Sequence, residues 1–260
     1  MNEHCFVILA HKESEYLEPC LISIINQTLK TKALITTSTP CDFSKNIAKK
    51  YGVEYIVNDT GQTGVVNDFN FAYNIADSKL VTLAHQDDLY EPDYAICIIE
   101  SSKLDSNALL YFTDCYDLIN NKKIGSSIKS LIKKLLLFPF LFRNSISSRS
   151  LKKMILVFGN PICCPSVTIN KSILSRFEFS NTFELIYDWK AWIDLTNESG
   201  SFIYLNKKLI QYRFHEVSVT SSQLNKLYAE ELKLFQIIWG NKLGKLICKI
   251  YSVAHNDRKD

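Results

Sequence analysis

The first half of the chain alternates between short apolar runs and segments with apolar residues at helical spacing. These strand-like and helix-like segments follow one another in the order 5–10, 17–27, 33–37, 42–51, 53–57, 67–76 and 80–84. A helix between successive strands, with short connections, predicts a parallel sheet covered by helices on both faces. Because such crossovers are right-handed, the carboxyl ends of the strands meet at one edge of the sheet. We therefore expect an α/β fold.

The expected helix at 42–51 has residues at both ends that indicate where it starts and stops. Asp42 precedes its periodic residues and is expected to cap the helix, and Gly52 is expected to end it after Tyr51. The helix at 67–76 should face inward through Phe69 and its neighbours.

The second half of the chain loses this regular alternation. We expect a strand at 109–113, a hairpin at 117–123 that turns at Asn120-Asn121, and a loop followed by a strand within 159–170. The later segments are a helix, two strands and a last helix, at 188–197, 202–205, 209–214 and 223–239. Since no repeat or low-complexity linker interrupts them, the expected organisation is one domain with an appended C-terminal portion.

Two adjacent carboxylates follow the strand at 80–84, in the sequence His85-Gln86-Asp87-Asp88. Neighbouring carboxylates repel, and each raises the pKa of the other unless a cation lies between them. The carboxyl edge of an open α/β sheet is also where ligands bind. A hard divalent cation with a phosphate beside it would satisfy this pair. The alternative is a solvated turn or a helix N-cap, in which Asp is common.

The other strands of the first half also end in polar or acidic residues. These are His11-Lys12-Glu13, Thr37-Ser38-Thr39 and Asn58-Asp59. Their convergence at one edge favours a binding site over a chance turn. The chain has no GxGxxG, GxxxxGK[ST] or GxSxG pattern, so phosphates bound here would need a metal ion instead of a glycine-rich cradle.

Composition excludes several classes of protein. A net charge of +3 over 260 residues, without interleaved basic and aromatic residues, argues against nucleic acid as a partner. The eight cysteines form no CxxC pair, which fits a reduced cytosolic protein and makes a zinc site unlikely. A strand that begins by Cys5 leaves no room for a signal peptide. No apolar stretch is long enough to span a membrane.

The segment 124–154 is both basic and apolar and contains no Asp or Glu. Its basic residues alternate with leucines and phenylalanines, and such a composition suits an anionic membrane surface. The alternative is a pair of helices that packs on the sheet and keeps its lysines in water. The sequence leaves both possibilities open.

Several segments together resemble the inverting family-2 glycosyltransferases, which have the GT-A fold. The resemblance covers nearly the whole length and rests on the order and spacing of CFVILAHKESEYLEPCLISIINQT, GVVNDFNFAYNIA, HQDD, IYDWKAW and YRFHEVSVT. HQDD aligns with the family's Asp-x-Asp-Asp. IYDWKAW, at 186–192, resembles the segment of the catalytic base. YRFHEVSVT, at 212–220, resembles the closing Arg-x-His-x-x-Ser element.

The resemblance implies a role for each matching position. Asp87 would coordinate Mn²⁺ or Mg²⁺ against the donor diphosphate, Asp88 would orient the metal shell or the donor sugar, and His215 would be a further metal or phosphate ligand. Asp188 would be the general base. His85 stands in the place of the family's first Asp and would contact the ribose or the metal. The residues alone favour a different role for His215, as a partly buried histidine bonded to a carbonyl.

The remaining positions would bind the nucleotide sugar. Arg213 would pair with phosphate oxygens through its guanidinium fork, and Ser218 and Thr220 would add hydroxyl donors. Asp68 would contact the nucleotide, although a carboxylate in the first turn of a helix also complements the helix dipole. The other expected donor-binding residues are Ala10, His11, Glu13, Thr37, Asn70 and Gln86.

Two positions depart from the family pattern. An acidic residue that reads the nucleobase often follows the second strand, and here Thr36-Thr37-Ser38-Thr39 stand there. UDP remains the expected nucleotide. The common Glu-Asp base motif is Tyr187-Asp188 in this chain, which keeps the Asp. Tryptophans beside Asp188 would strengthen this base by excluding water and would offer sugars an apolar face.

The resemblance thus implies a GT-A-type, Rossmann-like, mostly parallel sheet with helices on both faces and acceptor-side helices at the C-terminus. Residues 1–115 would form the nucleotide-sugar-binding half. Residues 116–222 would form the acceptor side with the catalytic base, and 223–260 a C-terminal helical extension.

The expected activity is metal-dependent transfer of a sugar, with inversion, from a nucleotide-diphosphate donor to a hydroxyl of a glycan or lipid-linked glycan. The setting would be surface polysaccharide synthesis in the cytoplasm, at the inner face of the cell membrane if 124–154 contacts it. One alternative is a sugar nucleotidyltransferase, which would want a glycine-rich loop where residues 11–14 have none. The other is a non-catalytic, membrane-associated partner protein.

Overall fold

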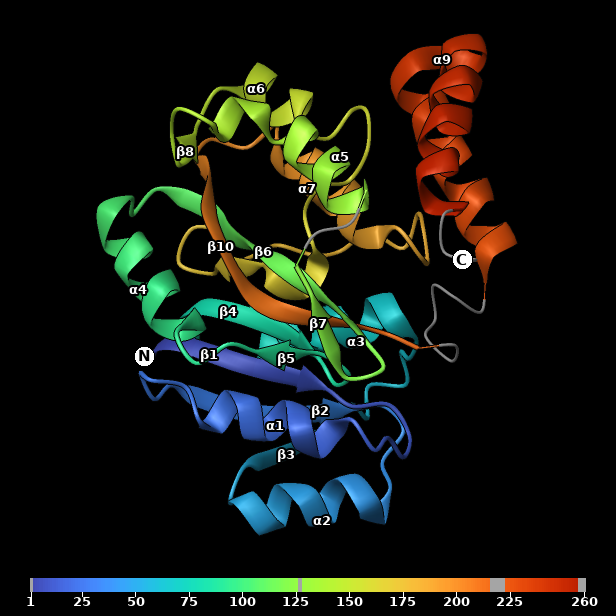
Figure 1. The fold of residues 1–260 in the computed structure, drawn as a ribbon. Helices are drawn as coiled ribbons and strands as arrows, with labels where there is room; N and C mark the ends of the chain where they lie inside the picture. The colour runs from blue at the N-terminus through green and yellow to red at the C-terminus, as the bar shows by residue number, and fades with distance from the viewer. Residues whose placement is uncertain (1, 126–127, 216–222, 257–260) are drawn as a thin grey trace.

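The computed structural model describes residues 2–125, 128–215 and 223–256. Their strands form one sheet in the order β3-β2-β1-β4-β9-β6-β10-β5, with β7 paired to β6 and β8 to β10. The first four strands are mutually parallel (Figure 1). They are β1 (Asn2–Leu9), β2 (Lys32–Thr37), β3 (Glu54–Val57) and β4 (Ser78–His85). The mixed α/β architecture with a mostly parallel sheet confirms the expected fold class.

The later strands extend the sheet beyond β4. Strand β9 (Thr168–Asn170) lies antiparallel between β4 and β6 (Ala108–Ile119), so β6 runs in the same direction as β4. The two strands expected at 202–205 and 209–214 are one long strand, β10 (Ser201–Phe214), which is parallel to β6 and has register shifts between Leu205 and Ile210. The short strands are β5 (Leu89–Tyr90), β7 (Lys122–Ile124) and β8 (Ser145–Ile146).

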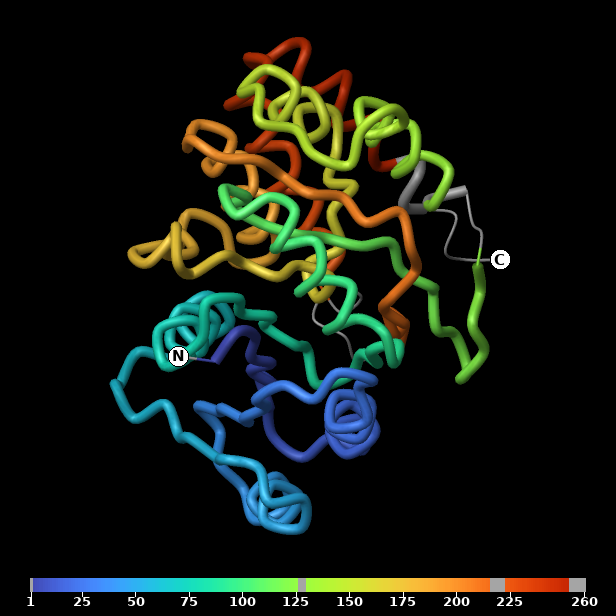
Figure 2. Tube along the Cα trace, turned by 90° about the vertical axis from the view of Figure 1, so that its left-hand side faces the viewer, coloured from blue at the N-terminus to red at the C-terminus, as the bar shows by residue number. Residues whose placement is uncertain are grey.

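The helices cover both faces of the sheet. They are α1 (Leu17–Ile25), α2 (Asp42–Tyr51), α3 (Val65–Ile75), α4 (Tyr94–Leu104), α5 (Ile128–Leu136), α6 (Arg149–Met154), α7 (Tyr187–Leu195) and α9 (Leu224–Asn256), with short 3₁₀ turns η1 (Phe138–Phe140) and η2 (Cys164–Ser166). Figure 2 shows the N-terminal elements, blue to cyan, and the later elements, yellow to red, at opposite ends of the molecule.

Strand β1 is covered on both faces, which explains why its sequence does not alternate between polar and apolar residues. Phe6 and Ile8 point into a core formed with α1, α2 and α4, whereas Cys5 and Val7 point into a second core that includes α3, α7 and α9. All four side chains are fully buried. A strand covered on both faces must be apolar at every position, which is what the run at 5–10 predicted.

Turn residues account for two of the boundaries. Asn120 and Asn121 both have positive φ, 50° and 60°, the conformation that a two-residue hairpin turn requires and that Asn tolerates. The hairpin between β6 and β7 is therefore confirmed. Gly52 ends α2 at a left-handed φ of 65°, as expected, but the proposed cap at Asp42 is wrong. The N-cap is the extended residue Cys41, and Asp42 lies in the first turn, where its charge complements the helix dipole.

The first part of the C-terminal helix α9 ends at a kink at Gly240 and so matches the helix expected at 223–239, and a second helical segment follows it. The chain leaves helical geometry only at Gly240 (φ 74°, ψ 172°) and then continues in helical conformation. Leu234 and Phe235 bury the first part of α9 against the core that contains α7. A residue with positive φ at the bend favours glycine at this position.

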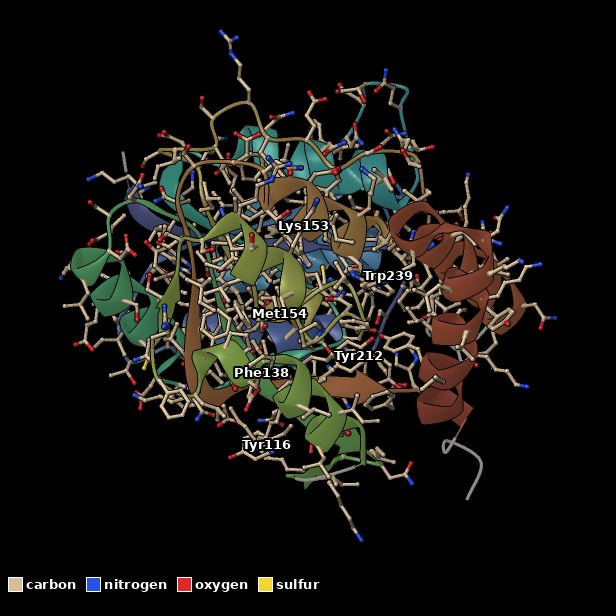
Figure 3. All side chains as sticks on the ribbon, turned by 90° about the horizontal axis from the view of Figure 1, so that it is seen from above. Tyr116, Phe138, Lys153, Met154, Tyr212 and Trp239 are labelled. Carbon is tan, nitrogen blue, oxygen red and sulfur yellow. The ribbon has the colours of Figure 1, made fainter. Side chains whose placement is uncertain are left out.

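The basic, apolar segment packs on the sheet and also exposes apolar side chains. Leu137, Phe140 and Ile146 are buried in the core. On the outside lie Leu131, Leu135, Phe138, Leu141 and Phe142, of which the last is 92 % exposed. Phe138 is labelled in Figure 3. Among the described residues, no helix is both long enough and apolar enough to cross a membrane.

Candidate active site

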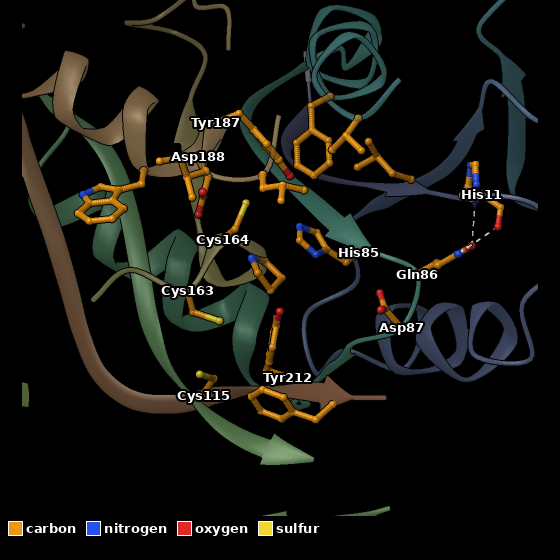
Figure 4. A pocket seen from close by; sticks show the side chains of 18 of the residues that line it. His11, His85, Gln86, Asp87, Cys115, Cys163, Cys164, Tyr187, Asp188 and Tyr212 are labelled. Atoms are coloured by element: carbon orange, nitrogen blue, oxygen red, sulfur yellow. Dashed lines mark hydrogen bonds between the residues drawn. The ribbon is translucent and has the colours of Figure 1, made fainter. Parts of the chain in front are cut away.

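A cavity of about 1310 Å³ opens at the carboxyl edge of the sheet, between the ends of β1, β2 and β4 and the later elements α7 and β10 (Figure 4). Most of the residues selected from the sequence line it. They are Ala10, His11, Glu13, Thr37, Asp68, His85, Gln86, Asp87, Asp188 and His215. Asn70, Asp88 and Arg213 lie outside this lining. Ser218 and Thr220 fall outside the described residues.

Asp87 and His215 meet on one wall of the cavity. Nε2 of His215 lies 2.9 Å from Oδ2 of Asp87, and both side chains are partly exposed to the cavity. His215 follows the end of β10, and β10 pairs with β5, the short strand directly after the acidic segment, so this pairing brings His215 to that segment. The ring of Tyr16 lies 5.1 Å from that of His215 and closes this wall. The contact supplies an imidazole and a carboxylate at one point of the cavity surface.

Gln86 joins the acidic segment to the end of β1. Its Oε1 accepts the backbone N–H of His11 at 2.9 Å, and its Nε2 donates to the carbonyl of His11 at 3.2 Å. This pair of bonds, drawn in Figure 4, engages both the oxygen and the nitrogen of the amide. Gln86 therefore holds the two strand ends in register beside the cavity.

Asp88 lies beneath the cavity wall and is 1 % exposed. Its Oδ1 accepts the backbone N–H of Arg213 at 2.8 Å. Its Oδ2 has no hydrogen-bond partner among the described residues, and neither has Nε2 of His85. Burial and the charge of Asp87 raise the pKa of Asp88 well above its usual range, whereas burial lowers the pKa of His85.

These residues fit a divalent cation. His85, Asp87 and Asp88 each offer a ligand atom, and the three atoms lie within 4.8 Å of one another. A buried carboxylate oxygen and a neutral imidazole nitrogen without partners are groups that a bound cation would satisfy. Carboxylate and imidazole together suit Mn²⁺, and carboxylate alone suits Mg²⁺. Asp87, beside His215, is the carboxylate that reaches the cavity surface.

Arg213 holds the acidic segment in place and connects it to the hairpin turn between β6 and β7. Its Nε donates to the carbonyl of Asp87 at 2.8 Å, and its Nη1 donates to Oδ1 of Asn121 at 2.7 Å. Its guanidinium also lies 4.5 Å from the ring centre of Tyr16. The hairpin turn at Asn121 thus reaches the site through Arg213. Contact between Arg213 and a phosphate stays a prediction.

The side of the cavity at the ends of β2 and β3 is a network of short polar side chains. Asp68, in the first turn of α3, accepts hydrogen bonds from Ser38 at 2.7 Å and from Asn58 at 2.9 Å. The hydroxyl of Thr39 accepts the backbone N–H of Lys12 at 2.8 Å. Asn70 takes no part in this network, because its amide pairs with the backbone N–H and carbonyl of Phe179.

Asp188 faces the cavity from the first turn of α7. Burial raises the pKa of its carboxyl group to about 6, against hydrogen bonds from the backbone N–H of Trp189 and from Asn160, which lower it. The bond from Nδ2 of Asn160 to Oδ2 measures 3.2 Å. The group is ionised at neutral pH and is a stronger base than an ordinary Asp.

The tryptophans near Asp188 have one of the two roles expected of them. Trp189 and Trp192 are each 1 % exposed. They exclude water, but their ring faces are packed in the core, so stacking on a sugar is not open to them. That expectation was wrong because α7 is covered by α9, which the local pattern did not show: Phe235 of α9 packs edge-on against Trp189.

Several cavity residues escaped the sequence analysis. Asn160 orients the carboxylate of Asp188, and Lys133 of α5, Cys115 of β6 and the adjacent Cys163 and Cys164 complete the wall around it. The basic segment had suggested Lys133 only as part of a surface. The adjacent cysteines Cys163 and Cys164 stand out in the sequence, but the sequence does not show that they lie beside Asp188 in the cavity wall.

The chain is similar to one known protein family and to several solved structures. The family model described as Glycosyl transferase family 2 matches residues 5–174. Among solved structures, S. aureus TarS 1–349 in complex with UDP-GlcNAc superposes with a TM-score of 0.66 at 11% identity, covering 98% of this chain and 73% of that one.

The same fragment in complex with UDP gives a TM-score of 0.62 at 10% identity, covering 99% of this chain and 72% of that one. A longer S. aureus TarS structure gives 0.62 at 11% identity, with 97% of this chain covering 43% of that chain. Identities this low show a shared fold. No curated protein matched the sequence.

Proposed function

The chain belongs to glycosyl transferase family 2, and from that premise we propose that it moves a sugar from UDP to a hydroxyl group of a glycan or lipid-linked glycan, with inversion. The observation that carries the proposal is that one cavity contains both the Asp87–His215 pair and the carboxylate of Asp188, whose pKa is raised to about 6. The complexes of S. aureus TarS with UDP and UDP-GlcNAc support a UDP-sugar as donor.

The donor would lie along the ends of β1, β2 and β4. Asp68, held by Ser38 and Asn58, would receive the nucleotide, and the diphosphate would reach Asp87 and His215. A bound Mn²⁺ or Mg²⁺ would supply Lewis-acid stabilisation of the leaving diphosphate. His215 would donate a hydrogen bond to a phosphate oxygen as negative charge develops there.

Asp188 would remove the proton of the acceptor hydroxyl at its Oδ1, while Asn160 holds Oδ2 in place. Burial supplies the basicity that this step needs, and such a base contributes on the order of 10²- to 10⁴-fold in rate. Attack from the side of Asp188, opposite the diphosphate, inverts the anomeric carbon.

Transfer assays with a panel of UDP-sugars, with and without Mn²⁺, test this function. Asp188→Asn should lower kcat by 10²-fold or more while UDP binding persists, because the base acts after donor binding. Asp87→Ala should abolish metal-dependent UDP binding. Asp194→Asn is the matched control, since Asp194 is exposed on the same helix and pairs with Lys190.

Other outcomes would contradict the proposal. Wild-type transfer rates in folded Asp188→Asn and Asp87→Ala variants would remove both assigned roles. Release of pyrophosphate from a nucleoside triphosphate and a sugar phosphate would indicate a nucleotidyltransferase instead. Absence of any metal-dependent nucleotide-sugar binding would favour a non-catalytic partner.

We further propose that the segment 124–154 contacts an anionic membrane at the cytoplasmic face, where surface polysaccharides begin on lipid-linked acceptors. Its exposed Leu141 and Phe142 adjoin the exposed Arg143. Apolar side chains beside cations fit anionic lipid headgroups, to which each cation near the surface adds about 1 kcal/mol of attraction.

Co-sedimentation with vesicles tests this contact. The protein should bind vesicles that contain phosphatidylglycerol and not those of phosphatidylcholine alone, and Phe142→Glu should weaken binding. Leu104→Glu is the control, because Leu104 is 89 % exposed at the end of α4. Equal binding of both variants, or binding without anionic lipid, would refute the contact.

A further inference from the structure

We infer that Glu230 of the C-terminal helix α9 is a positioning residue for the general base, because it holds the turn that leads into Asp188. Its Oε1 accepts the backbone N–H of Glu184 at 3.0 Å, and its Oε2 accepts those of Leu185 at 2.8 Å and Ile186 at 3.3 Å. Helix α7 begins at the next residue, and Asp188, labelled in Figure 4, is its second residue. The inference rests on the proposed function of Asp188 as the base.

The three hydrogen bonds fix the backbone of 184–186. Consecutive N–H groups that point at one anion form a nest, a concave arrangement of the backbone that binds negative charge. The N–H groups converge only while the turn keeps one conformation, and hydrogen bonds to an ionised acceptor are stronger than neutral ones. Ile186, the N-cap residue of α7, makes no side-chain hydrogen bond that would fix the start of the helix. Glu230 therefore determines where α7 begins.

Helix α9 also holds the loop that contains Asn160, the residue whose amide orients the carboxylate of the base. Nε1 of Trp239 donates to the carbonyl of Val157 at 2.8 Å, and the hydroxyl of Tyr251 accepts the backbone N–H of Asn160 at 3.3 Å. The loop and the helix approach closely, because a Cβ at Gly159 would lie 2.5 Å from Cε2 of Tyr251. The backbone that carries the base and the amide that orients it are thus fixed to the same helix.

Aromatic packing makes the contact between α7 and α9 rigid. The ring of Trp189, next to Asp188, lies 5.2 Å from that of Phe235 and 5.6 Å from that of Tyr251. Close-packed groups transmit a displacement instead of absorbing it, so a change at Glu230 should move the base. The residues proposed to hold the donor lie on β1, β2, α3 and β4. The change should therefore affect the chemical step and not donor binding.

A second contact between α9 and the same turn provides a matched control. Nζ of Lys226 pairs with the carboxylate of Glu184, and both side chains are exposed, 41% and 56%. An exposed pair of side-chain charges contributes little to stability and does not fix the direction of backbone N–H groups. Lys226→Gln therefore removes an attachment of α9 to the turn and leaves the three hydrogen bonds of Glu230 in place.

Steady-state kinetics of sugar transfer test the role. Glu230→Ala should lower kcat roughly tenfold or more, because a displacement of about 1 Å at a catalytic group costs up to about 10²-fold. The KM for the UDP-sugar and the affinity for UDP with Mn²⁺ should stay within about twofold, since lost transition-state contacts lower kcat. Glu230→Gln keeps one acceptor oxygen for Leu185 and Ile186, so it should restore part of kcat. Lys226→Gln should keep the wild-type kcat.

A double variant separates positioning of the base from general support of the fold. In an Asp188→Asn background, Glu230→Ala should lower the residual rate by less than about twofold, because its effect passes through the missing carboxylate. A further fall as large as that in the wild-type background would overturn the positioning role. A wild-type kcat in folded Glu230→Ala, or an equal loss of kcat in Lys226→Gln, would overturn it as well.

Hydrogen exchange, followed by mass spectrometry, tests the hold on the turn without any activity. The amides of 184–186 should exchange roughly tenfold or more faster in Glu230→Ala than in the wild type, because their acceptor is lost. Lys226→Gln should leave their exchange unchanged. Unchanged exchange in Glu230→Ala would show that Glu230 does not hold the turn. Faster exchange there, together with a wild-type transfer rate in Asp188→Asn, would refute only the proposed role of Asp188 as the base.

Discussion

Asp188 occupies a position where ionisation is costly to the folded chain. Its carboxyl pKa is about 6 in the structure, against 3.8 for an ordinary Asp. The folded state therefore keeps the proton to higher pH than the unfolded chain does. As pH rises from about 4 to about 6, folding stability is lost, and the full loss persists above that range. The same burial that makes Asp188 a good base makes it a source of instability.

Asp188→Asn should accordingly stabilise the protein at neutral pH while it abolishes transfer. A difference of about two pKa units corresponds to about 1–3 kcal/mol, since one unit is worth 1.36 kcal/mol. Urea unfolding at several pH values measures this gain, which should shrink towards zero near pH 4. If the gain in free energy of unfolding did not change with pH, burial would not be raising the pKa of Asp188.

The pH profile of transfer reports the same group. At saturating metal, kcat/KM should rise with pH through about 6, because the free enzyme needs an ionised Asp188. The hydrogen bond from Asn160 lowers this pKa, so Asn160→Leu should move the rise to higher pH by roughly half to one unit. Lys133 also faces the carboxylate and lowers its pKa. If the pH profile of kcat/KM in Asn160→Leu matched that of the wild type, the group that titrates would not be Asp188.

At the scale of elements, the basic segment is fastened to the sheet by one of its own lysines. Lys152 of α6 is fully buried, and its Nζ donates to the carbonyls of Glu198 and Gly200 at 2.7 and 2.8 Å. These carbonyls belong to the turn that leads into β10. Lys152 belongs to the segment whose composition suits a membrane surface, but its side chain joins α6 to the start of β10, the strand that His215 follows.

Lys152→Met should destabilise the fold by about 1–3 kcal/mol, because two carbonyl groups would lose their partner in a buried setting. Lys153→Met is a matched control: Lys153 is exposed, and its loss should change stability by less than about 0.5 kcal/mol. Urea midpoints compare the two variants. Equal effects would contradict the assignment of Lys152 as an anchor.

At the scale of the whole molecule, the cavity lies between an N-terminal half that holds the expected donor residues and later elements that hold Asp188 and His215. A ligand that contacts both halves stabilises the folded chain as a unit. UDP with Mn²⁺, at about 100 times its Kd, should add about 2.7 kcal/mol and raise Tm by about 5–8 °C.

Thermal scans separate the roles of the two carboxylates. UDP without Mn²⁺ should give a much smaller shift in Tm, and Asp87→Ala should lose the metal-dependent part of the shift. Asp188→Asn should keep it, because Asp188 lies on α7 and not at the strand ends that are proposed to hold the donor. An equal shift with and without metal would remove the cation from donor binding.

The sequence by itself determined the elements, because their signals are local. The apolar run of β1, the turn at Asn120-Asn121 and the left-handed Gly52 each act within a few residues, and each was predicted. The acidic segment was recognised because a strand end places it at the ligand edge. The order of motifs along the chain also identified the family.

Only the tertiary structure decided which side chains meet. The Asp87–His215 contact spans 128 residues, and the Asn160–Asp188 bond joins a loop to a helix. Such contacts depend on strand register and on the packing of α7, α9 and β10, which no local pattern encodes. For the same reason no local pattern showed that Lys152 donates to the carbonyls of Glu198 and Gly200 or that Arg213 donates to the carbonyl of Asp87, because burial is a property of the folded whole and not of the residue.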